Sequence, residues 1–185
     1  LFEASINEQT QQLLNGITEL GIFSVPIEHQ DNFEVLFRRD EELTAVFHKD
    51  SVFLEDGQKS VTLKDLEDVP LSLSSGCSEI VLKAFAQKSM VPRITCTSTT
   101  RSTTLEWTRV KAAVSIVPVE EGEDLGEEFV ARPISDITAD VYKTVVKVKD
   151  RPLSVAAQHF LKFYSKTRNS QQVCDLDAIL KSSNL

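Results

Sequence analysis

The chain has 185 residues, an apolar fraction of 41% and 28 acidic against 20 basic side chains, which gives a formal net charge of −8. This apolar content is that of a folded globular protein and excludes a wholly disordered chain. The excess of acid argues against direct nucleic-acid binding by this chain, because such binding needs a basic face; it leaves a nucleic-acid role for a larger parent protein open. No apolar run reaches the roughly 20 residues that a membrane-spanning helix needs.

Cysteine usage and the amino-terminal segment bear on the cellular compartment. Three cysteines do not make a disulfide framework, and the odd number leaves one of them unpaired. We therefore expect a reducing compartment, the cytoplasm. Residues 1–12 have neither the basic nor the apolar region of a signal peptide. The chain also begins without Met, and we expect it to be a fragment of a longer protein.

Short apolar runs alternate with helical patterns along the chain. The first expected element is a short strand at residues 1–5, followed by a helix at residues 7–14 that Gly16 would end. The continuous apolar run at residues 20–26 is typical of a strand buried on both faces. Further strands are predicted at residues 33–37, 43–47, 71–73, 93–97, 114–117, 129–131 and 140–149. Further helices are predicted at residues 79–89, 103–113 and 154–164, with a short helical turn at residues 64–68.

Polar segments separate several of these elements. Residues 74–78 have the composition of a polar turn, and Pro118 is expected to end the strand before an acidic stretch. That stretch, residues 120–128, holds six acids in nine residues with two glycines, which favours a solvated loop. After Lys166 the composition turns polar, so the remaining tail is expected to be either a loosely packed helix or partly disordered.

Strands that alternate with helices favour an α/β fold, with parallel sheets and helices on both faces. In such sheets, ligands bind at the carboxyl ends of strands beside helix N-termini. Hydroxyl residues follow several of the predicted strands, namely Ser5, Ser24, Ser74, Ser75, Thr97, Thr99 and Thr100. Hydroxyl and backbone N–H groups at a helix N-terminus suit a small anion, although the same residue types also serve simply as helix caps. Arg101 either supplies a counter-charge to such an anion or is an ordinary solvated side chain.

Several segments, taken in chain order, carry a resemblance to a known family. Residues 14–22 (LNGITELGI), 62–71 (TLKDLEDVPL) and 112–118 (AAVSIVP) resemble the patterns LxxGxxDLGI, sLxDLxdxPlI and aGxGIalvP of LysR-type transcriptional regulators, in their effector-binding domain. Shorter similar segments lie at residues 34–37, 41–46, 132–136 and 153–161. The joint order and spacing, over roughly residues 3–165, carries the resemblance, since each motif alone is weak.

The sequence departs from the family pattern at three places. Glu19 stands where the family usually has Asp, and Lys49-Asp50 replaces a common His-Pro pair. Ala113 and Val114 stand in a turn that usually contains Gly, which puts the tight backbone of that turn in doubt.

The resemblance implies two Rossmann-like lobes joined by two crossing strands, a fold similar to type 2 periplasmic binding proteins. The first lobe would comprise residues 1–40 and 141–185 and the second residues 41–140, with a small anionic effector expected in the cleft between them. The family's domain opens with a strand and a helix that precede the first segment of this chain, and a winged helix-turn-helix that binds DNA lies further upstream. We expect the natural protein to contain these parts. The resemblance also implies a homodimer or homotetramer.

Two alternatives stay open beside this regulatory function. Cys77 precedes a predicted helix, where the helix dipole lowers the pKa of a thiol, and the peroxide-sensing members of the same family carry a reactive Cys at a similar place. Cys77 would then be the reactive group of a redox sensor, or else a plain small side chain in a turn. The other alternative is the solute-binding protein of a transport system, which the lack of a signal peptide disfavours.

Signatures of catalysis and of metal binding are not found in the sequence. His29, His48 and His159 have no ligand spacing with Cys or with one another. There is no Gly-rich phosphate loop and no Gly-x-Ser-x-Gly elbow. We therefore expect no enzymatic activity, no cofactor and no metal. Trp107 falls inside a predicted helix, where a core or interface role is expected.

Overall fold

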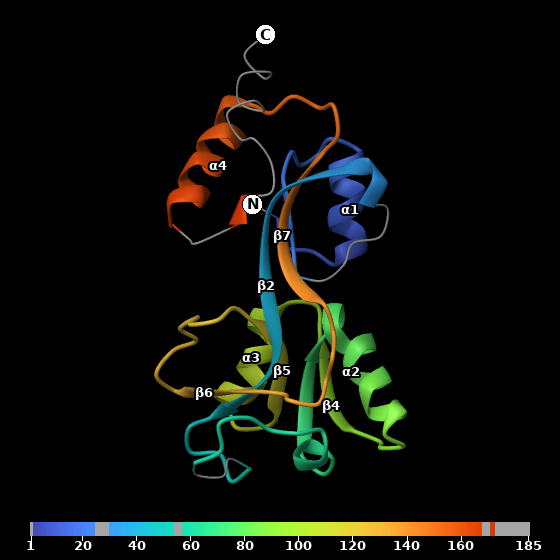
Figure 1. Ribbon diagram of the computed structural model, residues 1–185, viewed down its shortest axis with the longest axis vertical. Helices are drawn as coiled ribbons and strands as arrows, with labels where there is room; N and C mark the ends of the chain where they lie inside the picture. Colours follow the sequence, from blue (N-terminus) through green and yellow to red (C-terminus); the bar gives the residue numbers. More distant parts are fainter. Residues whose placement is uncertain (1, 25–29, 54–56, 168–170, 173–185) are drawn as a thin grey trace. The chain divides into compact units, whose positions relative to one another are not determined.

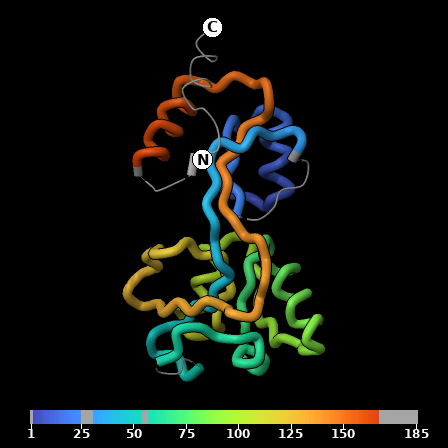
Figure 2. Tube along the Cα trace, viewed as in Figure 1, coloured from blue at the N-terminus to red at the C-terminus, as the bar shows by residue number. Residues whose placement is uncertain are grey.

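The computed structural model describes residues 2–24, 30–53, 57–167 and 171–172. The contacts between Cα atoms group the residues into two compact units. Unit 1 comprises Leu1–Ser5 and Glu41–Val141, and unit 2 comprises Ile6–Asp40 and Tyr142–Leu185. The chain passes from one unit to the other between Ser5 and Ile6 and again within the strands β2 and β7, whose course Figure 2 traces. The predicted first lobe corresponds to unit 2, and the predicted second lobe to unit 1. Residues 1–5 were expected in the first lobe, but they group with unit 1.

Unit 1 is built on a mixed sheet whose strand order is β6-β2-β5-β3-β4. Strands β3, β4 and β5 run parallel, while β2 is antiparallel to both β5 and β6. The strands of this sheet are β2 (Phe33–His48), β3 (Pro70–Ser74), β4 (Arg93–Ser98), β5 (Val114–Val119) and β6 (Phe129–Pro133). Its helices are η2 (Lys64–Leu66), α2 (Ser75–Gln87) and α3 (Arg101–Arg109) (Figure 1).

The core of unit 1 lies around β3, all five residues of which are buried. Helix α2 buries Cys77, Val81 and Phe85, which recur at the helical spacing of four residues and so form one apolar stripe. Helix α3 differs, because its two buried side chains are Thr104 and Thr108.

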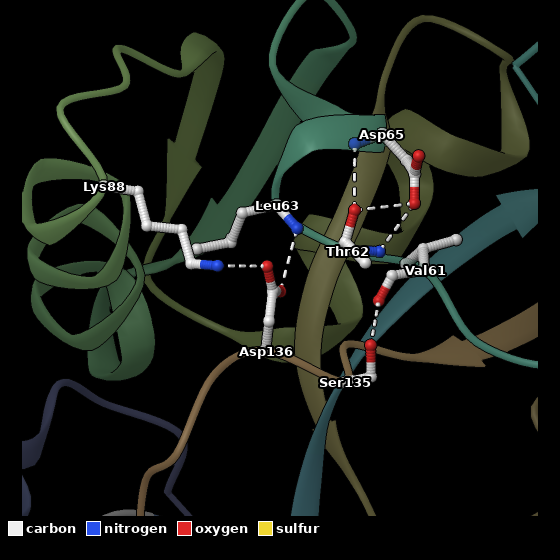
Figure 3. A network of polar contacts seen from close by, with 7 residues as sticks. All are labelled: Val61, Thr62, Leu63, Asp65, Lys88, Ser135 and Asp136. Atoms are coloured by element: carbon white, nitrogen blue, oxygen red, sulfur yellow. Dashed lines mark hydrogen bonds and ion pairs between the residues drawn. The ribbon is translucent and has the colours of Figure 1, made fainter.

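A polar network in unit 1 fastens the loop before η2 to the segment after β6 (Figure 3). Asp65 accepts hydrogen bonds from both the backbone N and the Oγ1 of Thr62, at 2.7 and 2.8 Å, so this residue pair closes the turn. Asp136 accepts a bond from the backbone N of Leu63 at 2.9 Å, and Lys88, at the end of α2, donates to its other oxygen at 2.7 Å. One carboxylate thereby joins three segments that are far apart in sequence.

Unit 2 contains a short sheet in which β7 lies between β1 and β2, with β8 paired to β2. Its elements are α1 (Ile6–Leu14), β1 (Gly21–Phe23), η1 (Gln30–Asn32), β7 (Val141–Val148), α4 (Val155–Thr167) and β8 (Gln171–Gln172). One apolar cluster joins Leu13 of α1 to Phe23, Phe33 and Val146 of the sheet. A second cluster joins the α4 residues Ala157 and Leu161 to the sheet residues Leu36, Phe37 and Val145.

Gly16 and Glu19 belong to the segment at residues 14–22 that resembles the family pattern, and both have structural roles. Gly16 has φ +72, a left-handed conformation that ends α1, and an added Cβ would lie 3.3 Å from Arg151 Nη1. Arg151 donates to the carbonyls of Leu13 and Leu14, at 2.6 and 3.1 Å, and so caps the last turn of α1. Glu19 accepts bonds from the backbone N and Oγ of Ser154, at 2.5 and 2.7 Å, so a carboxylate sits at the start of α4.

Most predicted elements are found, with differences at their ends. The strand expected at residues 1–5 is absent from the described residues 2–5, which are irregular. The strands expected at residues 33–37 and 43–47 are one continuous strand, β2. Helix α2 begins at Ser75, inside the segment expected to be a turn, and α3 runs over Arg101–Arg109 rather than residues 103–113. Much of the tail after Lys166 lies outside the described residues.

The early end of α3 and the late end of β5 each have a clear physical cause. Lys111 adopts φ +60 and the backbone N of Ala112 bonds to Trp107 O, so the chain turns after α3 before the two alanines are reached. Strand β5 continues through Pro118, which was expected to end it. Pro118 pairs with Leu43 of β2, and a proline is compatible with a strand where its position requires no donor. None of the described helices is long and apolar enough to cross a membrane.

Candidate functional site

Two neighbouring parallel strands of unit 1 end at the same level, and a helix begins after each. Ser74, the last residue of β3, is in register with Ser98, the last residue of β4. Helix α2 starts directly at Ser75, and α3 starts at Arg101 after two intervening threonines. We call residues 74–75 and 98–103 the β3–β4 edge. The predicted residues Ser74, Ser75, Thr99 and Thr100 are thus brought together.

The α2 side of the β3–β4 edge is held by serine hydroxyls. Ser74 is the N-cap residue of α2, but its Oγ makes no cap hydrogen bond and lies 3.1 Å from Cys77 Sγ. Ser75 is exposed, and its Oγ donates to Thr99 O at 3.4 Å. This contact bridges the turns that precede the two helices.

The α3 side of the β3–β4 edge is a capped helix start. Thr100 is the N-cap, and its Oγ1 accepts a bond from the backbone N of Thr103 at 3.3 Å. The same Oγ1 lies 3.0 Å from Ser102 Oγ and 3.1 Å from Thr103 Oγ1. Ser102 also donates to Glu3 Oε1 at 3.4 Å, so a carboxylate of the chain itself touches this hydroxyl cluster.

The electrostatics of the β3–β4 edge favour negative charge. In the fully described helices α2 and α3, neither first turn contains an acidic residue, although the chain carries 28 acids. The positive ends of two helix dipoles and several hydroxyl donors therefore lie beside one sheet edge. A carboxylate or another small oxyanion is the ligand that such an arrangement binds best.

Arg101, considered as a counter-charge, already has a carboxylate partner. Its Nη1 lies 3.1 and 3.2 Å from the two oxygens of Glu123, in the acidic loop, and both side chains are about one-quarter exposed. Its Nε and Nη2 are buried without a hydrogen-bond partner among the described residues. Arg101 is thus neither a lone solvated residue nor an uncompensated charge.

The remaining predicted residues lie elsewhere. Thr97 is exposed within β4, opposite Leu73, one residue before the strand ends. Ser5 is half-buried directly before α1, and Ser24 is half-buried directly after β1 in unit 2. Sequence reasoning missed Ser98 and Ser102. Ser98 is the last residue of β4, so the strand-end argument that found its neighbours could also have found it.

The structure corrects the prediction that Cys77 precedes a helix and has a lowered thiol pKa. Cys77 lies inside the first turn of α2, not before the helix, and it is fully buried. Burial raises the pKa of the thiol, and its hydrogen bonding with Ser74 lowers the pKa by less. Its sulfur also lies 3.4 Å from Ile116 O. A buried thiol with a raised pKa lacks the exposed thiolate that reaction with peroxide requires, so the structure favours the plain core side chain.

No group of three or more His, Cys, Asp and Glu side chains in the part of the chain that the structure describes could hold a metal ion. The Nδ1 atom of His48 accepts a hydrogen bond from the backbone N–H of Asp50 at 3.1 Å. Trp107 of α3 is about one-third exposed.

The chain matches a known family model and several solved structures. The family model described as "LysR substrate binding domain" matches residues 1–168. Comparison with curated proteins returned no significant match.

Solved structures with the same fold include two isolated regulatory domains. The effector binding domain of QuiR in complex with shikimate superposes with a TM-score of 0.69 at 20% identity, over 90% of this chain and 81% of that one. The CcmR regulatory domain of Synechocystis PCC6803 in complex with 2-PG gives 0.68 at 17% identity, over 89% and 81%. Full-length CbnR complexed with its target DNA gives 0.63 at 23% identity, over 80% of this chain and 52% of that one. The chain therefore spans about half the length of this full-length regulator.

Proposed function

Since the chain belongs to the family of LysR substrate-binding domains, which are parts of transcriptional regulators and not enzymes, we propose that it senses a small anionic effector through the β3–β4 edge. Its fold is that of the type 2 periplasmic-binding-protein-like regulatory domains. The single observation that carries the proposal is that two helices without acidic first turns begin at adjacent, hydroxyl-rich strand ends.

The predicted residues divide into two groups under this proposal. Ser74, Ser75, Thr99 and Thr100 belong to the β3–β4 edge and are the primary contacts we propose, with Thr97 one position further back on β4. Ser24 follows the end of β1, whereas Ser5 precedes α1 with no strand before it among the described residues. Contact of either residue with the effector remains a prediction. In the parent regulator, effector binding would favour one conformation of the domain over others and so change how an upstream DNA-binding part engages DNA. Assembly as a homodimer or homotetramer is part of the same proposal.

The ligands of the relatives suggest the first probes. QuiR was solved with shikimate, a carboxylate, and CcmR with 2-PG. We would titrate the chain with shikimate, 2-PG and inorganic phosphate by isothermal calorimetry, with thermal shift as a second readout. Saturable binding of at least one probe is expected. The proposal fails if none of these anions gives heat or a concentration-dependent rise in melting temperature.

Variants of one residue type then test the location. Thr100→Val removes the hydroxyl that caps α3, and we expect about a tenfold loss of affinity, since a hydrogen bond to a charged group contributes about 1.5 kcal/mol or more. Thr100→Ser should restore binding because it keeps the oxygen. The matched control is Thr95→Val, an exposed threonine in the middle of β4. Equal loss of affinity in Thr95→Val and Thr100→Val would place the site elsewhere.

A further inference from the structure

The fully buried side chains of helix α3 carry hydroxyl groups, and the partly buried Leu105 adds an apolar contact with Val46 and Val117 of the sheet. The side chains of Ser72 on β3, Ser115 on β5, and Thr104 and Thr108 on α3 are all fully buried. We call these four residues the hydroxyl relay. Helix α2, on the same sheet, is instead fixed by the apolar side chains Val81 and Phe85 together with Cys77. Buried hydrogen bonds therefore contribute to the anchoring of α3, whereas the buried face of α2 is largely apolar.

The bonds of the hydroxyl relay converge on one backbone carbonyl. Ser115 Oγ donates to Thr104 O at 2.8 Å, and Ser72 Oγ makes a weaker contact with the same oxygen at 3.5 Å. Thr108 Oγ1 lies 2.6 Å from Ser115 Oγ. A hydroxyl has one hydrogen to give, and Ser115 gives its hydrogen to Thr104. Thr108 must then donate to Ser115, which agrees with its longer distance of 3.4 Å from Val46 O.

Thr104 connects the hydroxyl relay with the rim of the candidate site. Its Oγ1 donates to Thr100 O at 2.8 Å, and its backbone N bonds to the same oxygen at 3.1 Å. Thr100 is the N-cap residue whose Oγ1 receives the backbone N of Thr103. A continuous path of hydrogen bonds therefore runs from β5 through Ser115 and Thr104 to the first turn of α3.

These hydrogen bonds fix the orientation of α3 more strictly than apolar packing would. Apolar contacts are non-directional, whereas buried hydrogen bonds fix one arrangement because a displaced partner is left unsatisfied at high cost. We propose that the hydroxyl relay sets the rotation and register of α3, and that Ser115 and Thr104 are positioning residues for the N–H groups and the Thr100 hydroxyl of the β3–β4 edge. This proposal rests on the proposed function only where it concerns ligand affinity.

The first test uses amide hydrogen exchange and needs no ligand. In Ser115→Ala and in Thr104→Val, the amides of Thr103 and Thr104 should exchange about tenfold faster than in the wild type, as expected when one buried hydrogen bond is lost. The amides of α2 should be unchanged, and Thr104→Ser should restore protection because it retains the hydroxyl. The matched control is Thr10→Val in unit 2, because buried Thr10 donates to Ile6 O at 2.8 Å as Thr104 does to Thr100 O. Exchange in α3 that is no faster in the relay variants than in Thr10→Val would overturn the proposal.

The second test links the hydroxyl relay to binding. With whichever of shikimate, 2-PG or inorganic phosphate the wild type binds, affinity should fall about fivefold in Ser115→Ala and Thr104→Val and recover in Thr104→Ser. An unchanged affinity together with faster exchange would overturn the positioning role. If the wild type binds none of the probes, the proposed function fails, while the exchange result still decides whether the hydroxyl relay fixes α3. Should Ser115→Ala not fold, Thr104→Val and Thr104→Ser carry both readouts.

Discussion

Lys88 Nζ lies 2.7 Å from Asp136 Oδ2, and the other oxygen of that carboxylate accepts the backbone N–H of Leu63 at 2.9 Å. Burial raises the pKa of the Asp136 carboxyl, but the bonds from Lys88 and Leu63 outweigh it, so the pKa is lowered. A carboxyl whose folded pKa is depressed stabilises the fold fully above its unfolded pKa, about 4. That contribution is lost as the pH falls through the folded pKa.

The first prediction concerns Asp136→Asn. The amide keeps an acceptor for Leu63 but loses the ion pair with Lys88, so we expect a cost of about 1 kcal/mol in the free energy of unfolding at pH 7. The decline of stability between about pH 5 and pH 2 should also become shallower than in the wild type. Urea unfolding over this pH range measures both effects. Asp124→Asn, at an exposed position of the acidic loop, is the reference variant; an identical slope for all three proteins would contradict the prediction.

The second prediction concerns the end of α1. Gly16→Ala places a Cβ 3.3 Å from Arg151 Nη1 at a position with φ +72, so it combines left-handed strain with pressure on the cap. We expect a loss of about 1.5 kcal/mol, of which about 1 kcal/mol comes from the backbone conformation. Gly122→Ala is the matched control, because Gly122 has φ +73 and nothing within 4 Å of an added Cβ. Chemical denaturation of both variants separates the two effects; equal losses would show that the Arg151 contact contributes nothing.

Local signals in the sequence predicted the elements that depend on local chemistry. Gly16 ends α1 where expected, and Asp65 closes the turn within the segment expected to be a helical turn. The long strand β2 was predicted as two strands because its middle is polar and charged. Arg38 there stacks over the Tyr142 ring at 3.8 Å, an interaction between neighbouring strands that no local pattern reveals.

The position of Ser74, Ser75, Thr99 and Thr100 at one sheet edge was predictable, because polar residues after neighbouring parallel strands are expected there. Their contact with an effector stays a prediction. The hydroxyl relay could not be found in this way. Thr104 and Thr108 look like surface residues of a polar helix, and only the position of α3 over Ser72 and Ser115 shows that they are buried. Cys77 was misjudged because the helix start was placed four residues too late, at Glu79 rather than Ser75.

The third prediction concerns Thr144 on β7. Its side chain is buried, and its Oγ1 has no hydrogen-bond partner among the residues that the structure describes. Thr144→Val keeps the shape and removes the unsatisfied hydroxyl, so we expect the free energy of unfolding to rise by about 1 kcal/mol. Thr10→Val is the opposing control in the same unit, because Thr10 Oγ1 donates to Ile6 O at 2.8 Å. Thermal and urea unfolding should move in opposite directions for the two variants, and destabilisation of Thr144→Val would mean that its hydroxyl has a partner.

The fourth prediction tests the redox alternative at Cys77. Because the thiol is fully buried and burial raises its pKa, we expect little thiolate and slow reaction with peroxide or alkylating reagents. Cys96 is half-buried in the edge strand β4 and serves as the internal control. In a Cys174→Ser background, iodoacetamide should label Cys96 first under native conditions and should label Cys77 only at the rate of global unfolding. Mass spectrometry after millimolar peroxide should find Cys77 reduced. A sulfenate or disulfide at Cys77 that forms before any change at Cys96 would restore the redox-sensing function and would require the first turn of α2 to open in the native state.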